Sequence, residues 1–136
     1  MSNNLNNISP IDGRYSKITK ELTNYFSESA LIKYRVFIEI QYLIHLSKID
    51  ISVFKNVSQK NIKKIEAIYN NLSIQDIKRI KKIESVTNHD VKAVEYFLKE
   101  KFDKLKLGDI KEFIHFGLTS QDINNTASPL LFKDYL

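Results

Sequence analysis

The stretch SESALIKYRVFIEIQYLIHLSK, residues 27–48, decides the fold that this sequence predicts. Ser27 stands where an N-cap residue is favoured, at the start of a dense apolar run. The apolar residues recur at spacings of three and four, which is typical of an α-helix: Leu31, Ile32, Val36, Phe37, Ile40, Leu43, Ile44 and Leu46. Because they cover most of the helix circumference, we expect this helix to be buried on most sides.

Further helices follow this one, with few residues that would interrupt them. Ser58 precedes one apolar stripe at helical spacing, and Ser73, with Asp76 as its capping-box partner, precedes another. A third stripe follows Asp90, which stands at a cap position, and Gly108 is expected to end that helix. The 136 residues contain only 3 Gly and 2 Pro. The sequence therefore predicts an all-α fold.

Two polar stretches and a proline are expected to interrupt or delimit the remaining helices. Residues 84–90 break it before the third stripe, and residues 119–122 (TSQD) have the form of a capping box that opens a last helix. Pro129 lies inside that helix and is expected to kink it or divide it into two pieces. The pattern continues to the last residue without a cap, so we expect a truncated chain.

Composition excludes several classes of protein and several kinds of site. There is no Cys, so neither a disulfide framework nor a thiolate metal site is expected. The three histidines, His45, His89 and His115, lack the paired spacing of a zinc site, so no metal site is expected. No stretch approaches the roughly 18 apolar residues of a membrane span. Residues 1–7 are polar and do not resemble a secretory signal, which favours a cytoplasmic protein.

The net charge is +5, and much of the excess lies between Lys55 and Lys82. Two interpretations remain open for this basic cluster: a nucleic-acid surface, or the solvated face of one or more helices. Tyr69 is the one aromatic residue among these basic residues. A surface that binds nucleic acid would need aromatic side chains between the basic ones, on which the bases could stack. The solvated face is therefore the favoured interpretation, and no nucleic-acid partner is expected.

Three polar loops, each placed before a helix, carry the candidate site. In residues 9–15 (SPIDGRY), Arg14 offers a planar guanidinium for a phosphate or carboxylate and Tyr15 adds a hydroxyl. An alternative is that Arg14 forms an ordinary surface ion pair. Residues 87–90 (TNHD) begin a helix, where amide groups favour an anion, and His89 can move a proton near neutral pH.

Each of the other two loops also has a purely structural interpretation. Asn88 or Asp90 would cap the helix, with His89 an incidental neighbour, and residues 119–122 would be a capping box without a ligand. His115 and His45 lie on apolar segments and are expected to be satisfied core or interface histidines.

Three blocks of sequence together resemble the amino-terminal part of the adenylosuccinate lyase family, within the fumarase/aspartase superfamily. They are SPIDGRY (residues 9–15), TNHDVKAVEYFLKEK (residues 87–101) and EFIHFGLTSQDINN (residues 112–125). The resemblance implies a carbon–nitrogen lyase of purine and AMP biosynthesis. Such an enzyme eliminates fumarate from adenylosuccinate to give AMP, and from SAICAR to give AICAR, without a cofactor. It also implies a homotetramer whose sites are built from three subunits. By this resemblance, residues 1–108 would form a small helical domain and residues 109–136 would begin a long-helix bundle domain.

The resemblance also assigns roles to individual residues. Arg14 and Tyr15 would hold the nucleotide phosphate, and His89 would be a supporting acid or hydrogen-bond donor. The full set of implied substrate-binding residues is Arg14, Tyr15, Asn88, His89, Asp90, Thr119, Ser120 and Gln121. In this family the principal catalytic His and a mobile-loop Ser come from later segments, so these 136 residues alone are expected to be inactive. A non-catalytic helical interaction module and a basic nucleic-acid-binding domain are the alternatives.

Overall fold

The computed structural model describes residues 6–136, and these residues form helices and turns without a strand. The all-α prediction is confirmed. Of the polar stretch at residues 1–7, the first five residues lie outside the described part. No helix within residues 6–136 is both long enough and apolar enough to cross a bilayer.

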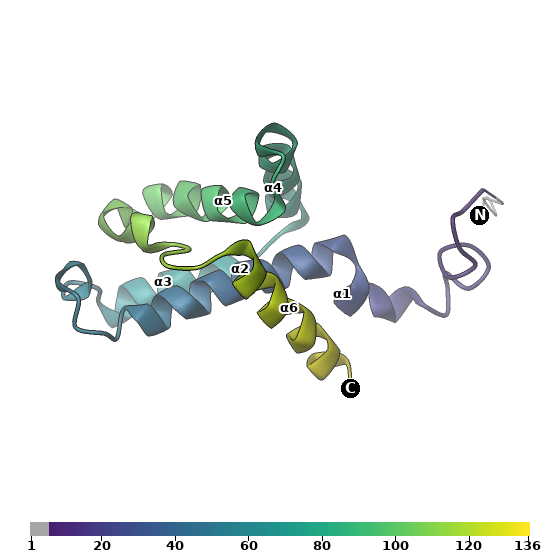
Figure 1. Cartoon of the computed structure of the whole chain (residues 1–136), viewed down its shortest axis with the longest axis horizontal. Helices are drawn as coiled ribbons and strands as arrows, with labels where there is room; N and C mark the ends of the chain where they lie inside the picture. The colour runs from purple at the N-terminus through teal and green to yellow at the C-terminus, as the bar shows by residue number, and fades with distance from the viewer. Residues whose placement is uncertain (1–5) are drawn as a thin grey trace.

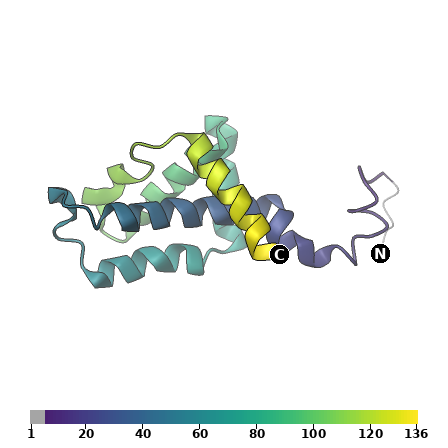
Figure 2. The ribbon, with the colours of Figure 1, turned by 60° about the horizontal axis from the view of Figure 1, so that its bottom comes forward.

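The long helix α2 (Glu28–Leu46) runs through the middle of the fold (Figures 1 and 2). Ser27 caps it as predicted, because the Ser27 hydroxyl accepts a hydrogen bond from the Ala30 N–H at 3.1 Å. Nine of its residues are buried, which confirms the expected broad burial: Ala30, Ile32, Arg35, Val36, Glu39, Ile40, Leu43, Ile44 and Leu46. His45 is exposed and so is not a core histidine, although its Nδ1 lies 2.7 Å from the Gln41 carbonyl oxygen, and its place in an interface stays a prediction.

Two helices after α2 begin at the predicted caps. Helix α3 (Gln59–Asn70) is capped by Ser58, and α4 (Ile74–Thr87) by Ser73 in a capping box with Asp76. Helix α4 extends further than predicted, because residues 84–87 continue it and the expected break is reduced to Asn88 and His89.

Helix α5 (Asp90–Lys104) packs along α4 and against α2. It does not end at Gly108 as predicted. Lys106 adopts a left-handed φ of 59°, and the Leu107 N–H bonds the Phe102 carbonyl at 2.9 Å, which is a Schellman ending without glycine. Gly108 instead begins the 3-10 helix η3 (Gly108–Phe113).

The last helix, α6 (Ser120–Tyr135), crosses α2 and ends beside the short helix α1 (Thr23–Phe26) (Figure 1). It is one continuous helix with Pro129 inside it, so the expected division into two pieces does not occur. Ile123, Ala127 and Leu131 are its buried residues, and their spacing of four places them on one face.

The main core lies between α2, α3, α4, α5 and η3. Its largest fully buried side chains include Phe97 and Phe102 from α5 and Ile40 and Leu43 from α2. One short 3-10 helix, η2 (Ser52–Phe54), closes the end of the core beyond α2 and contacts η3. The core therefore fixes α2 and α5, the two helices that carry most of the candidate site.

The chain before α2 forms an arm that projects from the helical body (Figures 1 and 2). It consists of turns over residues 6–19, the 3-10 helix η1 (Lys20–Leu22) and the short α1 (Thr23–Phe26). The turns are held by local bonds, such as Tyr15 N–H to Pro10 O at 2.8 Å. The arm thus carries the first predicted loop away from the core.

Candidate functional site

His89 joins the starts of two helices. It is the N-cap of α5, and its Nδ1 accepts a hydrogen bond from the Lys92 N–H at 3.1 Å. An Nδ1 that accepts carries no proton, so the neutral ring has its proton on Nε2. Nε2 lies 3.2 Å from the Ser120 hydroxyl at the start of α6 and donates to it. The predicted loops at residues 87–90 and 119–122 are therefore in direct contact.

Asn88 has a backbone function at this junction. Its φ of 50° and ψ of 34° are left-handed, and its N–H bonds the Glu84 carbonyl at 2.8 Å. Asparagine tolerates this conformation better than most residues. Asn88 therefore caps the carboxyl end of α4, rather than the start of α5, and its turn directs the chain into His89.

Asp90 is the first residue of α5, so its predicted position as the N-cap is wrong by one residue. One carboxylate oxygen accepts the Val91 N–H at 2.8 Å, and the other lies 2.6 Å from Nη2 of Arg35. Partial burial favours the protonated form, but the Val91 amide and the Arg35 charge outweigh it and lower the pKa of Asp90. Asp90 therefore faces the site as a carboxylate.

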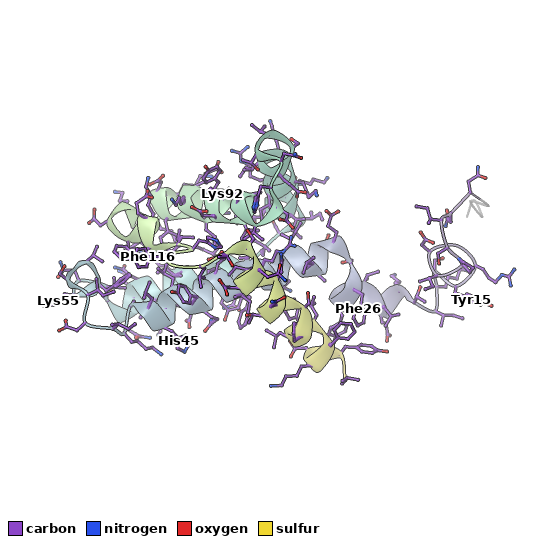
Figure 3. All side chains as sticks on the ribbon, in the orientation of Figure 1. Tyr15, Phe26, His45, Lys55, Lys92 and Phe116 are labelled. Carbon is purple, nitrogen blue, oxygen red and sulfur yellow. The ribbon has the colours of Figure 1, made fainter. Side chains whose placement is uncertain are left out.

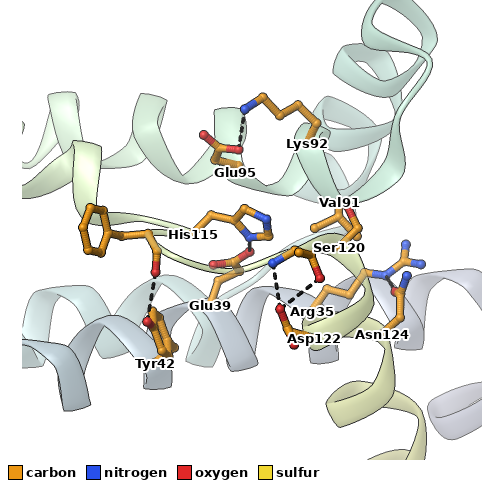
Figure 4. Close-up of polar contacts among 12 residues, drawn as sticks. Arg35, Glu39, Tyr42, Val91, Lys92, Glu95, His115, Ser120, Asp122 and Asn124 are labelled. Carbon is orange, nitrogen blue, oxygen red and sulfur yellow. Dashed lines mark hydrogen bonds and ion pairs between the residues drawn. The ribbon is translucent and has the colours of Figure 1, made fainter.

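Arg35 links this carboxylate to α6. It lies on α2 with only 8% of its surface exposed. Its Nε donates to the Asn124 side-chain oxygen at 2.9 Å, as Figure 4 shows. One guanidinium thus contacts the residue after His89 and the residue four positions after Ser120.

Thr119, Ser120 and Gln121 have different partners although they are consecutive. The Asp122 carboxylate accepts hydrogen bonds from the Thr119 N–H at 2.7 Å and the Thr119 hydroxyl at 2.9 Å, which lower the pKa of Asp122. Thr119 and Asp122 therefore form the predicted capping box. Gln121 donates to Asn125 at 2.7 Å, and Ser120 alone contacts His89. Of these three side chains, Ser120 is the one directed at the other loop.

A second histidine, His115, contacts helix α2. His115 Nδ1 is 2.5 Å from a carboxylate oxygen of Glu39, a residue with 1% of its surface exposed (Figure 4). Burial raises the pKa of Glu39, and the contact with His115 partly offsets this effect. His115 itself has a left-handed φ of 61°, and Tyr42 donates to the next carbonyl, Phe116 O, at 2.9 Å. His115 is thus the satisfied histidine that the sequence predicts.

The first predicted loop does not join the other two in this chain. Arg14 and Tyr15 are exposed, and the Arg14 guanidinium lies 5.8 Å from the centre of the Tyr15 ring. Figure 3 places Tyr15 on the projecting arm, far from Lys92 at the start of α5. Within this chain, Arg14 and Tyr15 therefore take no part in the contact between His89 and Ser120.

Sequence reasoning missed Arg35, Glu39 and Asn124. A signal was present for two of them, because Arg35 and Glu39 are charged residues four positions apart inside an apolar helix, and so share a face. Three of the basic residues in the cluster are paired with acidic residues: Lys55 with Asp50, Arg79 with Glu100, and Lys81 with both Glu28 and Glu84. Within residues 6–136, no group of three His, Cys, Asp or Glu side chains is arranged to hold a metal ion.

Known proteins that are similar to this chain show the family to which it belongs. The lyase family model matches residues 13–136, so the chain belongs to the lyase family. Among curated relatives, the adenylosuccinate lyase of Dictyostelium discoideum is 54% identical over 132 residues, which are 94% of this chain and 28% of that protein. Those of Buchnera aphidicola (from Acyrthosiphon pisum) and Escherichia coli K12 are 48% and 44% identical, each over 93% of this chain and 28% of their own length.

These relatives confirm the resemblance to adenylosuccinate lyase drawn from the three sequence blocks. The chain spans about 28% of the length of these relatives. The two alternatives, a helical interaction module and a nucleic-acid-binding domain, are not favoured by this match.

Proposed function

We propose that this chain is the amino-terminal part of an adenylosuccinate lyase, a carbon–nitrogen lyase of purine and AMP biosynthesis. The whole enzyme would eliminate fumarate from adenylosuccinate to give AMP and from SAICAR to give AICAR. The proposal includes a cytoplasmic homotetramer, and it takes α6 as the beginning of the long-helix domain. The elimination needs a base, an acid and anion-binding groups, and no cofactor.

The contact between His89 and Ser120 is the observation that carries this proposal. It brings together the amino termini of α5 and α6, where amide groups and helix dipoles favour a negative charge. The substrate's succinyl group supplies carboxylates, and charge develops on one of them when a carbon acid beside it loses its proton. Donors already in place at such a position stabilise the intermediate without reorganisation.

The residues of this chain would share the work as follows. Ser120, with Thr119 and Gln121 beside it, would bind a carboxylate, and His89 would donate a hydrogen bond from Nε2 or, when its ring is protonated, a proton. Asn88 and Asp90 would line the same pocket, while Arg14 and Tyr15 would bind the phosphate from another position in the assembly. The principal proton-transfer groups would come from outside these 136 residues.

A chimera with the Escherichia coli relative tests the proposal. Residues 1–136 would replace the matching segment of that enzyme, which is 44% identical over 131 residues. We expect the purified chimera to release fumarate from adenylosuccinate, followed by ultraviolet absorbance, and the separate 136-residue chain to release none.

Two controls make the result decisive. His89→Ala in the chimera should lower kcat by about 10²-fold or more, the usual contribution of a positioned acid or base. Arg79→Gln, which breaks an exposed ion pair with Glu100, should leave turnover unchanged. A chimera that assembles as a tetramer but produces no fumarate would contradict the proposed function, as would turnover by the separate chain.

A further inference from the structure

We infer that Arg35 is the positioning residue that holds His89 and Ser120 at hydrogen-bonding distance, by fixing the starts of α5 and α6 to the buried helix α2. The catalytic importance of this distance rests on the proposed function, whereas the role of Arg35 in holding the two side chains together does not depend on it.

The two contacts of Arg35 fall beside the two members of the pair. Asp90 follows His89 directly, and its Oδ2 lies 2.6 Å from Nη2 of Arg35. Asn124 lies one helical turn after Ser120, and its oxygen accepts from Nε of Arg35 at 2.9 Å. His89 and Ser120 are separated by 3.2 Å between Nε2 and Oγ. Arg35 thus closes a ring of contacts through α2, α5 and α6.

The guanidinium suits this task because its planar group holds several N–H donors in fixed directions. The two contacts use Nε and Nη2, so the orientation of the plane is determined by both partners. A lysine ammonium in the same place is a point charge on a flexible stem and does not impose two directions at once. Arg35 can therefore set a relative position that a positive charge alone would not set.

Burial gives the arrangement a rigid base. Arg35 has 8% of its surface exposed, and its neighbours on α2, Val36 and Ile32, are buried in the core. Asp90 has 44% of its side chain exposed, so water can solvate the carboxylate if Arg35 is removed. Loss of Arg35 is therefore expected to loosen the two helix starts more than it unfolds the chain.

Three variants test this role in the 136-residue chain and in the chimera: Arg35→Gln, Arg35→Lys and Asn124→Ala, with Arg79→Gln as the matched surface control. Nitrogen NMR of the His89 ring reports its tautomer. In Arg35→Gln we expect the Nε2 signal to shift, because its hydrogen bond to Ser120 is lost, and the Nδ1 signal to stay in place, because the bond from the Lys92 N–H remains. Arg79→Gln should leave both signals in place.

Kinetics of the chimera give a second readout. We expect Arg35→Gln to lower kcat/KM by about 10²-fold, the usual effect of a misplacement of about 1 Å. The loss should fall mainly on kcat, and Arg35→Lys should restore only a small part of it. If Arg35→Gln does not fold, Asn124→Ala removes the α6 contact alone and should produce the same change in the His89 signals with a smaller kinetic loss.

The outcomes separate this inference from the proposed function. Unchanged His89 signals in folded Arg35→Gln, or in Asn124→Ala where that variant replaces it, would overturn the inference. A kcat/KM of the Arg35→Gln chimera within twofold of the parent chimera would also overturn the inference. An inactive chimera combined with altered His89 signals would instead overturn the proposed function and leave the positioning role supported.

Discussion

Replacement of His89 by Ala and by Asn separates the two contacts of its ring. Ala removes the N-cap bond to Lys92, worth about 1 kcal/mol, and the half-exposed bond to Ser120, worth about 0.5 kcal/mol. Asn keeps the cap, because its side-chain oxygen can accept the Lys92 N–H, and loses only the Ser120 contact. The free energy of unfolding should therefore fall by about 1.5 kcal/mol for Ala and about 0.5 kcal/mol for Asn.

Thermal unfolding followed by circular dichroism measures this difference. An unfolding entropy of about 2.1 cal/mol/K per residue gives about 0.29 kcal/mol/K for 136 residues. The melting temperature should then fall by about 5 °C for His89→Ala and about 2 °C for His89→Asn.

Ser120→Ala provides the control for the second contact. It should lower the melting temperature of the parent chain, and have almost no effect when His89 is already Asn, because the contact is then absent. Equal melting temperatures for His89→Ala and His89→Asn would refute the reasoning, since the ring would then not be the cap of α5.

Three other predictions concern the core, the stability at low pH and the pKa of one tyrosine. Phe102→Ala should lower the free energy of unfolding by about 4 kcal/mol, measured in urea, because the ring is fully buried; a loss below about 1 kcal/mol would contradict this packing. Burial opposes ionisation of Asp76, but bonds from Lys101 and the cap residue lower its pKa. Its contribution to stability is complete above the unfolded pKa of about 3.9 and is lost as the pH falls through the lower folded value, so Asp76→Asn should flatten the acid limb of stability against pH; an unchanged limb would contradict it. Burial and the bond to Asp134 raise the pKa of Tyr34 to about 12, so Asp134→Asn should lower it in an ultraviolet titration, and an unaltered titration would show that the bond is absent.

The helix starts could be predicted because their chemistry is local. Ser27, Ser58 and Ser73 each cap the helix expected of them, and each acts within three residues of itself. The end of α5 could not be predicted in the same way. There Lys106, a residue without a turn preference, adopts the left-handed conformation because burial of Leu107 stabilises the ending.

The site was predictable in its parts and not in its connections. Polar residues before apolar stripes marked His89 and Ser120 separately, but their contact joins positions 31 residues apart. The contact between Arg35 and Asn124 joins positions 89 apart, and such a pair follows only from the packing of α2 against α6. The position of Arg14 relative to the other loops stays a prediction for the assembled protein.

Helix α2 also fixes the distance between two of the contacts described above. Arg35 reaches the starts of α5 and α6, and Glu39, four residues later, reaches His115. One residue inserted between them would turn the second half of the helix by about 100° and send Glu39 away from its partner. Length changes in this lineage should therefore accumulate in the loop between Leu46 and Ser58, while the interval from Arg35 to Glu39 stays constant.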